Sequence, residues 1–587
     1  MTRRKKNEIL IDIDIHKIRD YYSGIFNKPL IVDKKFINHI NEQIGSLNHD
    51  NYSSIDININ ELQLALKETS ISNVIGNDGV SSNMLLNCND NFINSKLIFF
   101  YKYIFKYGVI PKGLNITHIR PIIKDKSLSF NDLNNLRPIS ISNVLAQIFE
   151  RLLGYSLNEI KKTHQNQFGY KSRTSCTHAL FIFKETIIKH LDVNKSIIAI
   201  KLDAVKAFDL QWREALFYKL MNENLKLNNS MSKVILLRIY YDSLESMILN
   251  NKKFSRLFKL FRGVKQGGVL SGSLFNFFIN ELIEICCNAN IGAKFIDIIV
   301  CILIFCDDIC LLSDSIEEMQ VLLKLCEEFA NKWGIEFNLE KCKYMVFGKI
   351  KLNNIIFKLN NQIISSTDCF KYLGLEFNSK LEMSSFFIKK FQNVKNSFFS
   401  LNSFGFKQGG VNPFLQIFVY KSYCISRLLY GLEIINLNKK TLNILNIGQN
   451  DIVRYITGLS RNSHISNTLK ILKLFNINDL YFYMKLIFIK NLKSNHICNY
   501  IFNFLLTSNY KNNTLSFIKD FKTLCVKLNE SMLFVANNIN LQITKYKDEY
   551  RDYEKNVENE LILICLQNSG DVIMRQQLNF ITYAGTI

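Results

Sequence analysis

The amino-acid sequence predicts an α+β fold in which antiparallel strands are followed by a long helical part. An apolar, largely β-branched run over residues 296–305 stops at Asp307-Asp308 and resumes over residues 309–312, which is the pattern of a β-hairpin with two carboxylates at its turn. Residues 196–203 form another apolar run, and it also ends in a carboxylate, Asp203. From about residue 380 onward, apolar side chains recur at helical spacing.

Length and charge narrow the class of protein. A chain of 587 residues can bury several cores, and its 73 Lys and Arg against 51 Asp and Glu give a net charge of +22, which favours a polyanionic partner such as nucleic acid. No stretch offers about 18 uninterrupted apolar residues, so no membrane partner is expected. The 14 cysteines include no Cys-x-x-Cys pair, so we expect reduced thiols in an intracellular compartment.

Residues 1–70 are predicted to be an N-terminal leader with helical segments and no recognisable chemistry. Its basic start, from Arg3 to Lys6, fits a short nuclear address, and it fits a solvated basic end equally well. The predicted location is therefore intracellular and nuclear.

Residues 111–140 hold three of the five prolines of the chain. Because proline cannot donate to a strand ladder, we expect short, exposed strands here that carry Lys124 and Arg137 toward a shared space. Two cations on one hairpin suit a triphosphate, whereas either residue alone would more simply belong to a basic, solvent-facing rim.

The next segment interleaves aromatic and basic residues in a turn that contains Gln167, Phe168, Gly169 and Arg173. Such a mix suits base stacking beside a neutralised phosphate backbone, although the signal is weak alone. An amphipathic helix is predicted from Cys176 to about residue 190.

The segment 261–273 is a glycine-rich loop that leads into a helix, and it contains Gln266 and Gly267. It lacks the Gly-Lys-Ser/Thr of a phosphate-binding P-loop, so nucleotide hydrolysis on such a loop is not supported.

Asp307 and Asp308 repel each other and are flanked by apolar strands, so a cation of high charge density would stabilise them. Mg²⁺ prefers such oxygen ligands and fills the rest of its shell with water and phosphate. Asp203, at the end of its own strand, is a third candidate ligand, and Asp209 is better explained as a helix-start residue. For an arbitrary Asp-Asp pair, a solvated turn would be the simpler explanation.

The order of these motifs resembles that of reverse transcriptases of non-LTR (LINE-like) retrotransposons over residues 60–490. Nine segments carry the resemblance, namely residues 76–79, 119–124, 136–140, 167–170, 202–209, 263–268, 305–308, 339–343 and 370–374. The likeness implies a right-hand polymerase fold with fingers, an antiparallel-sheet palm and a helical thumb. The implied domains are a leader (1–70), fingers and palm (71–378), a thumb (379–475) and a helical C-terminal extension of unknown role (476–587).

The resemblance also implies an activity, RNA-directed DNA synthesis, in which deoxynucleotides are added to a primer 3′ end. Its partners would be an RNA template, a DNA primer or target DNA, and deoxynucleoside triphosphates. Two Mg²⁺ ions, with Mn²⁺ as an alternative, would be held by Asp203, Asp307 and Asp308. Lys341 would assist the departure of pyrophosphate as an acid.

The remaining roles follow from the same likeness. Lys124 and Arg137 would clamp the triphosphate, and Phe208 would face the sugar and exclude a 2′-hydroxyl. Gln266 and Gly267 would contact the nascent pair. The primer and template would be held by Gln167, Phe168, Gly169, Arg173, Tyr372, Leu373 and Gly374.

The chain departs from the family pattern at Lys265, Gly268 and Cys306, but it retains the three carboxylates and Gln266. Two alternatives remain open: a maturase and reverse transcriptase of the group II intron kind, or a decayed remnant that only binds nucleic acid.

Overall fold

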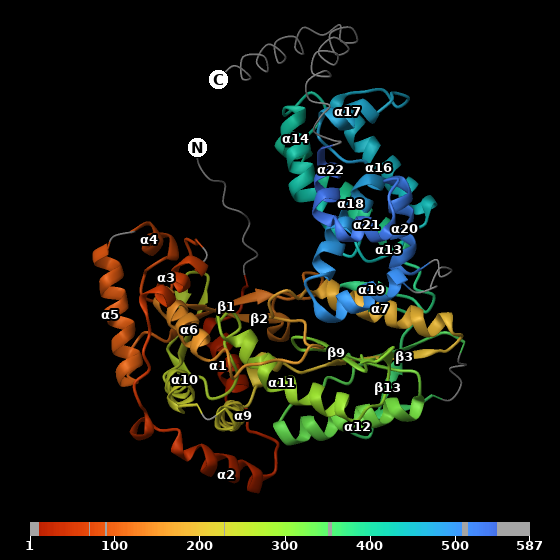
Figure 1. Cartoon of the computed structure of the whole chain (residues 1–587). Helices are drawn as coiled ribbons and strands as arrows, with labels where there is room; N and C mark the ends of the chain where they lie inside the picture. Colours follow the sequence, from red (N-terminus) through yellow and green to blue (C-terminus); the bar gives the residue numbers. More distant parts are fainter. Residues whose placement is uncertain are drawn as a thin grey trace. The chain divides into compact units, whose positions relative to one another are not determined.

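The structure, a computed structural model, describes residues 11–69, 71–88, 91–227, 229–349, 355–507 and 515–548. The chain divides into two compact units: residues 1–175, 198–344 and 351–366 form the first, and residues 176–197, 345–350 and 367–587 form the second. The basic segment from Arg3 to Lys6 and the end of the predicted C-terminal extension, after residue 548, lie outside the described residues. The chain contains both helices and sheets, and the predicted α+β class is confirmed (Figure 1).

Most residues of the two main sheets belong to the first unit. One has the order β12-β13-β11-β3-β10-β9, with β10 antiparallel to both of its neighbours. Its strands are β3 (Ile197–Asp203), β9 (Ile302–Phe305), β10 (Asp308–Ser313), β11 (Lys343–Phe347), β12 (Phe357–Leu359) and β13 (Gln362–Ser366). The other sheet has the order β2-β1-β4-β5, and β6 pairs with β4. Its strands are β1 (Ile116–Ile123), β2 (Leu136–Ser142), β4 (Glu245–Asn250), β5 (Lys253–Phe254) and β6 (Phe258–Lys259).

Helices cover both sheets of this unit. Of these, α11 and α12 pack against β9, β10 and β12. The helices are α1 (Ile15–Phe26), α2 (Lys34–Gln43), α3 (Ile59–Glu68), α4 (Ser82–Asn87), α5 (Asn91–Tyr107), α6 (Val144–Ser156), α8 (Ala207–Leu210), α9 (Arg213–Lys226), α10 (Ser232–Asp242), α11 (Ser271–Asn288) and α12 (Ile316–Trp333). Strands β3 and β10 are buried on both faces, which explains why their sequences are apolar throughout.

The apolar run at 296–305 is not one strand, as its sequence predicted. It is divided between a small ribbon, β7 (Lys294–Phe295) with β8 (Ile298–Ile299), and β9. Ile296 adopts a left-handed backbone with φ +57° in the turn of the ribbon. A run of apolar residues alone does not reveal such a turn, because its β-branched residues all favour strand.

The proline-rich strands are also less exposed than predicted. β1 lies between β2 and β4, and its residue Ile119 is fully buried. The pairing with β4 covers only Ile116 to Ile119. Pro121 lies beyond it, opposite Pro138 of β2, so neither proline removes a hydrogen bond from a central strand.

The second unit is mainly helical. It contains α7 (Cys176–Asp192), α13 (Ser384–Phe399), α14 (Pro413–Val419), α15 (Ser426–Leu429), α16 (Lys439–Thr457), α17 (Ser466–Ile471), α18 (Ile477–Leu492), α19 (His496–Thr507), α20 (Phe517–Lys527), α21 (Met532–Asn537), α22 (Ile539–Asp548) and the hairpin β14 (Phe370–Tyr372) with β15 (Leu375–Phe377). A π-helical turn, Tyr420–Cys424, separates α14 from α15. Among the helices of the described ranges, none has both the length and the apolar character needed to cross a bilayer.

A buried ion pair connects the glycine-rich loop to α6. The Lys265 ammonium and the Glu150 carboxylate form an ion pair with both side chains at most 1% exposed. Lys265 also donates to the hydroxyl of Tyr240 at 2.7 Å, and Glu150 accepts from the backbone N–H of Leu270 at 3.2 Å. Burial alone would raise the pKa of Glu150, but the adjacent Lys265 lowers it below its usual value. Glu150 therefore holds the loop at two positions, Lys265 and Leu270.

We expect Glu150→Gln to destabilise the first unit by about 3–5 kcal/mol, because the Lys265 charge would stay buried without a counter-ion. Urea unfolding measures this change. The matched control is Glu223→Gln, which breaks the exposed pair with Lys226 and should cost less than about 1 kcal/mol. Equal effects of the two substitutions would show that Lys265 and Glu150 do not act as a buried pair.

Candidate functional site

The three acidic residues predicted as metal ligands lie at one end of the strands of the six-stranded sheet. Asp203, the last residue of β3, is directly opposite Asp308, the first residue of β10. Phe305 and Asp308 close the β9–β10 hairpin, so Cys306 and Asp307 form its two-residue turn. Residues opposite each other in antiparallel strands have Cα atoms about 4.5–5.5 Å apart. Burial, together with the charges of Asp308 and Asp203, raises the pKa of Asp307. The three carboxylates thus share one electrostatic site.

Two lysines balance this negative charge. The Lys201 ammonium lies 2.7 Å from Asp308 Oδ1, and the Lys341 ammonium lies 3.4 Å from Asp203 Oδ2. Within the described ranges, no three acidic, histidine or cysteine side chains are gathered closely enough to enclose a metal ion. The donor set nevertheless fits a hard divalent cation, because it consists of carboxylate oxygens on partly exposed side chains at a shared site. A bound cation would have to displace the two ammonium groups.

The Cys306-Asp307 turn is held by a hydrogen bond to the segment around Gln167, which was predicted to contact the primer or template. The Gln167 side-chain oxygen accepts from the N–H of Gly169 at 2.9 Å and from that of Cys306 at 3.1 Å. Gly169 approaches Cys306 so closely that an added Cβ would lie 2.7 Å from its backbone nitrogen. Gln167 and Phe168 are at most 1% exposed, so they support the turn and do not face a nucleic acid strand. Arg173, which ends the segment, is exposed.

Four cations gather beside the carboxylates. Burial and the charges of Lys206, Lys341 and Arg137 lower the pKa of Lys124, with Asp209 acting in the opposite direction. These four basic residues therefore lie near one another, although they come from the ends of β1 and β2, from the start of α8 and from the segment before β11. Lys206 and Lys201 were not predicted as site residues. Their side-chain partners lie far along the chain, so no local pattern indicates them.

Phe208, the predicted sugar gate, is half-buried on α8. Its ring stacks on Phe275 with centroids 4.8 Å apart and meets the edge of Tyr170 at 6.2 Å. Its carbonyl accepts from the N–H of Val264 at 2.8 Å, which ties α8 to the glycine-rich loop. The ring is therefore held on two sides.

The glycine-rich loop lies against β2. The Gln266 carbonyl accepts from the N–H of Ser140 at 2.7 Å. Gly267 has φ +111°, and an added Cβ would lie 2.7 Å from the carbonyl oxygen of Ser140, so only glycine fits there. Gln266 is half-buried and Gly267 is exposed, on the unit that carries the three carboxylates.

The predicted primer residues Tyr372, Leu373 and Gly374 belong to the second unit. They form the end of β14 and the two-residue turn before β15. Leu373 and Gly374 both have positive φ, and the Leu373 carbonyl accepts from the hydroxyl of Tyr430. Tyr372 is fully buried, so its ring belongs to the core of this unit and does not face a strand of nucleic acid.

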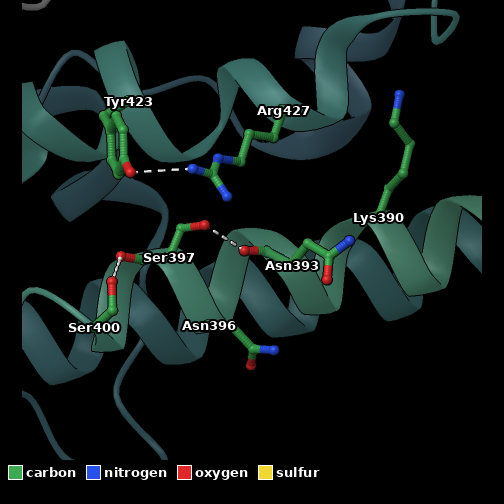
Figure 2. A pocket seen from close by; sticks show the side chains of 7 residues that line it. All are labelled: Lys390, Asn393, Asn396, Ser397, Ser400, Tyr423 and Arg427. Carbon is green, nitrogen blue, oxygen red and sulfur yellow. Dashed lines mark hydrogen bonds between the residues drawn. The ribbon is translucent and has the colours of Figure 1, made fainter. Parts of the chain in front are cut away.

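The second unit also contains a polar pocket that the sequence did not predict, with a volume of about 440 Å³. Figure 2 shows its lining from α13 and the residue that follows it, from the π-helical turn and from α15, namely Lys390, Asn393, Asn396, Ser397, Ser400, Tyr423 and Arg427. Lys390 Nζ donates to the carbonyl of Tyr430 at 2.6 Å, and Arg427 Nη2 donates to the hydroxyl of Tyr423 at 3.1 Å. Two cations and two amides thus line the pocket, and none of its lining residues is acidic.

Known proteins that are similar to this chain include reverse transcriptases. Residues 123–377 match the family described as reverse transcriptase (RNA-dependent DNA polymerase). The RNA-directed DNA polymerase from mobile element jockey of Drosophila funebris is 22% identical over 376 residues, which cover 62% of this chain and 40% of that protein. A Pol polyprotein of the R2 retrotransposable element of Popillia japonica is 24% identical over 338 residues, covering 56% of this chain and 45% of that protein. The chain thus spans less than half the length of these relatives.

Among solved structures, telomerase from Candida Tropicalis in complex with an RNA fragment covers 73% of this chain and 68% of its own, with 16% identity and a TM-score of 0.36. A structural similarity with so low a TM-score does not support a conclusion about family or function. The family match and the two transposon relatives confirm the resemblance inferred from the nine motifs, and with it the right-hand polymerase class of fold. Residues 123–377 therefore match the reverse transcriptase family, and the chain resembles the polymerases of non-LTR (LINE-like) retrotransposons.

Proposed function

We propose that this chain is an RNA-directed DNA polymerase that copies an RNA template by extending a DNA primer or the end of a target DNA with deoxynucleoside triphosphates. The observation that supports it most directly is the register that puts Asp203 opposite Asp308 and next to Asp307, inside a reverse transcriptase domain. In this proposal the fingers and palm belong to the first unit, and the thumb belongs to the helices of the second.

Polymerases of this family depend on a divalent metal. Asp203, Asp307 and Asp308 would hold it, and we propose two Mg²⁺ ions, which Mn²⁺ can replace. When bound, such ions make a primer 3′-hydroxyl more acidic and neutralise charge on the transferred phosphate. The protein contributes the oxygen ligands and the surrounding apolar strands β9 and β10, which limit access of water to one side of the site.

The four cations supply the triphosphate site. Lys124 and Arg137 would bind the phosphate oxygens, Arg137 through its planar fork of donors. Lys341, which is 65% exposed and lies on Asp203, would turn to the leaving pyrophosphate and donate a proton to it. Phe208, held by Phe275 and Tyr170, would contact the sugar at C2′.

We expect Asp307→Asn to reduce primer extension on RNA by at least about a thousandfold, because the amide lacks the charge needed to bind the metal ions. RNA affinity should change by less than about twofold. Asp297→Asn, the same substitution at the exposed turn of the β7–β8 ribbon, is the matched control and should retain full activity. Undiminished extension by the Asp307 variant, measured with labelled primer, would refute the assignment.

Phe208→Ala should raise the ratio of ribonucleotide to deoxynucleotide incorporation by about 10- to 100-fold, because a cavity would replace the ring that meets the 2′ position. Single-nucleotide extension with UTP and with dTTP measures the ratio, and the rate with dTTP on the same variant is the control. An unchanged ratio would mean that another side chain selects the sugar.

The polar pocket of the second unit supports a contact with the RNA backbone. Arg427 and Lys390 each make one identified hydrogen bond to the protein and carry further N–H donors that can reach a phosphate oxygen. We expect Arg427→Ala to weaken RNA binding about three- to tenfold and to reduce the slope of log affinity against log salt by about one. The control is Arg461→Ala, which removes an exposed arginine outside the pocket lining. If both variants lost the same affinity and slope, the pocket would have no special part in binding.

A further inference from the structure

The N-terminal segment was expected to have no chemistry, but its first helix reaches the nucleotide site. α1 docks through an apolar stripe of Ile18, Tyr22 and Phe26, each at most 3% exposed. Beyond the helix, the Lys28 carbonyl accepts from Arg262 Nη1 at 3.1 Å, at the base of the glycine-rich loop. Tyr21 is half-buried and lies off this stripe, so its hydroxyl is not needed to dock the helix.

The Tyr21 hydroxyl instead joins two of the four cations. It accepts from Lys206 Nζ at 3.0 Å and donates to the side-chain oxygen of Asn134 at 2.7 Å. The backbone carbonyl of the same Asn134 accepts from Lys124 Nζ at 2.8 Å. The Lys206 ammonium also lies 4.7 Å from the centre of the Tyr21 ring. One tyrosine thus connects the start of α8 to the hairpin that carries Lys124.

Such a connection is needed because the cations repel one another. Burial and then the charge of Lys206 lower the pKa of Lys124, while Asp209 acts in the opposite direction on both lysines. Lysine side chains without such partners would turn into bulk water. Lys206 has a left-handed backbone at φ +46° and is the residue that directly precedes α8. A neutral hydroxyl between the two ammonium-bearing segments holds them together without adding a charge that a triphosphate would have to displace.

We infer that Tyr21 is a positioning residue for the incoming nucleoside triphosphate, holding Lys206 directly and Lys124 through Asn134 at the phosphate end of the site. This inference rests on the proposed polymerase function, since the triphosphate is the substrate of that reaction. It gives the N-terminal helix a part in nucleotide affinity and makes Lys206 a phosphate ligand beside Lys124 and Arg137.

The test is Tyr21→Phe, with Tyr22→Phe as the matched control. Both remove one hydroxyl from adjacent positions of α1, and the Tyr22 hydroxyl is buried without a hydrogen-bond partner among the described residues. We expect Tyr21→Phe to raise the KM for dATP about five- to tenfold and to change kcat by less than about twofold. Tyr22→Phe should leave both unchanged. In a Lys206→Met background, Tyr21→Phe should add much less, since the two groups act as a unit. A fall in kcat alone, or equal KM values for the two phenylalanine variants, would overturn the inference.

A second readout does not depend on activity. Lys206 in the full-length chain is modified with an amine-acetylating reagent and quantified by mass spectrometry, with and without dATP. Tyr21→Phe should increase its modification at least about threefold and Tyr22→Phe should not, while dATP should protect Lys206 in the parent protein. If the parent protein extends no primer but these differences hold, the polymerase proposal fails and the positioning by Tyr21 stands. If it extends primers and the differences are absent, only the inference about Tyr21 fails.

Discussion

Asp203 and Asp308 are like charges directly opposite each other across two adjacent buried strands, and this arrangement governs the rest of the first unit. Such a pair is unfavourable in a sheet, and the neighbouring Asp307 makes it more so. The structure compensates in two ways. Lys201 pairs with Asp308 and Lys341 pairs with Asp203. The Gln167 side-chain oxygen also accepts a hydrogen bond from the backbone N–H of Cys306, which holds the turn. Both features keep the acids in place when no cation is bound.

The elements that surround the acids come from distant parts of the chain, and buried polar contacts connect them. Lys265 and Glu150 attach the glycine-rich loop to α6, and Arg262 attaches its base to the end of α1. Breaking one of these buried contacts is destabilising, because it leaves a charge or a hydrogen-bond donor away from water without a partner. The geometry of the site thus depends on residues that never touch a substrate.

Sequence patterns predicted those parts of the fold whose cause is local. The strand that ends at Asp203, the hairpin at Asp307 and the helix from Cys176 all lie where predicted, because periodicity is a property of neighbouring residues. The turn at Ile296 was missed because it lies within a run of β-branched residues that favour strand. Gln167 was assigned to nucleic acid because its sequence gives no sign of burial.

The candidate site likewise contains some residues that the sequence predicts and others that only the fold brings together. The three carboxylates follow strand ends and could be grouped from sequence and family likeness, whereas Lys206, Lys201 and Tyr21 acquire partners only through the fold. Their side-chain contacts join positions far apart in the chain, up to 185 residues for Tyr21 and Lys206. Reading motifs one at a time cannot recover pairs of this kind.

The contacts of α1 show that the packed structure of the first unit includes residues near the N-terminal end of the described chain. The match to the reverse transcriptase family starts at residue 123, yet Arg262 and Lys206 inside it form hydrogen bonds with side-chain or backbone atoms of residues 21–28. A recombinant fragment trimmed to the recognisable region would expose the surface that α1 covers and would leave these two cations without those partners. Expression designs for this protein should therefore take their N-terminal limit from packing, upstream of residue 15, and not from the edge of sequence similarity.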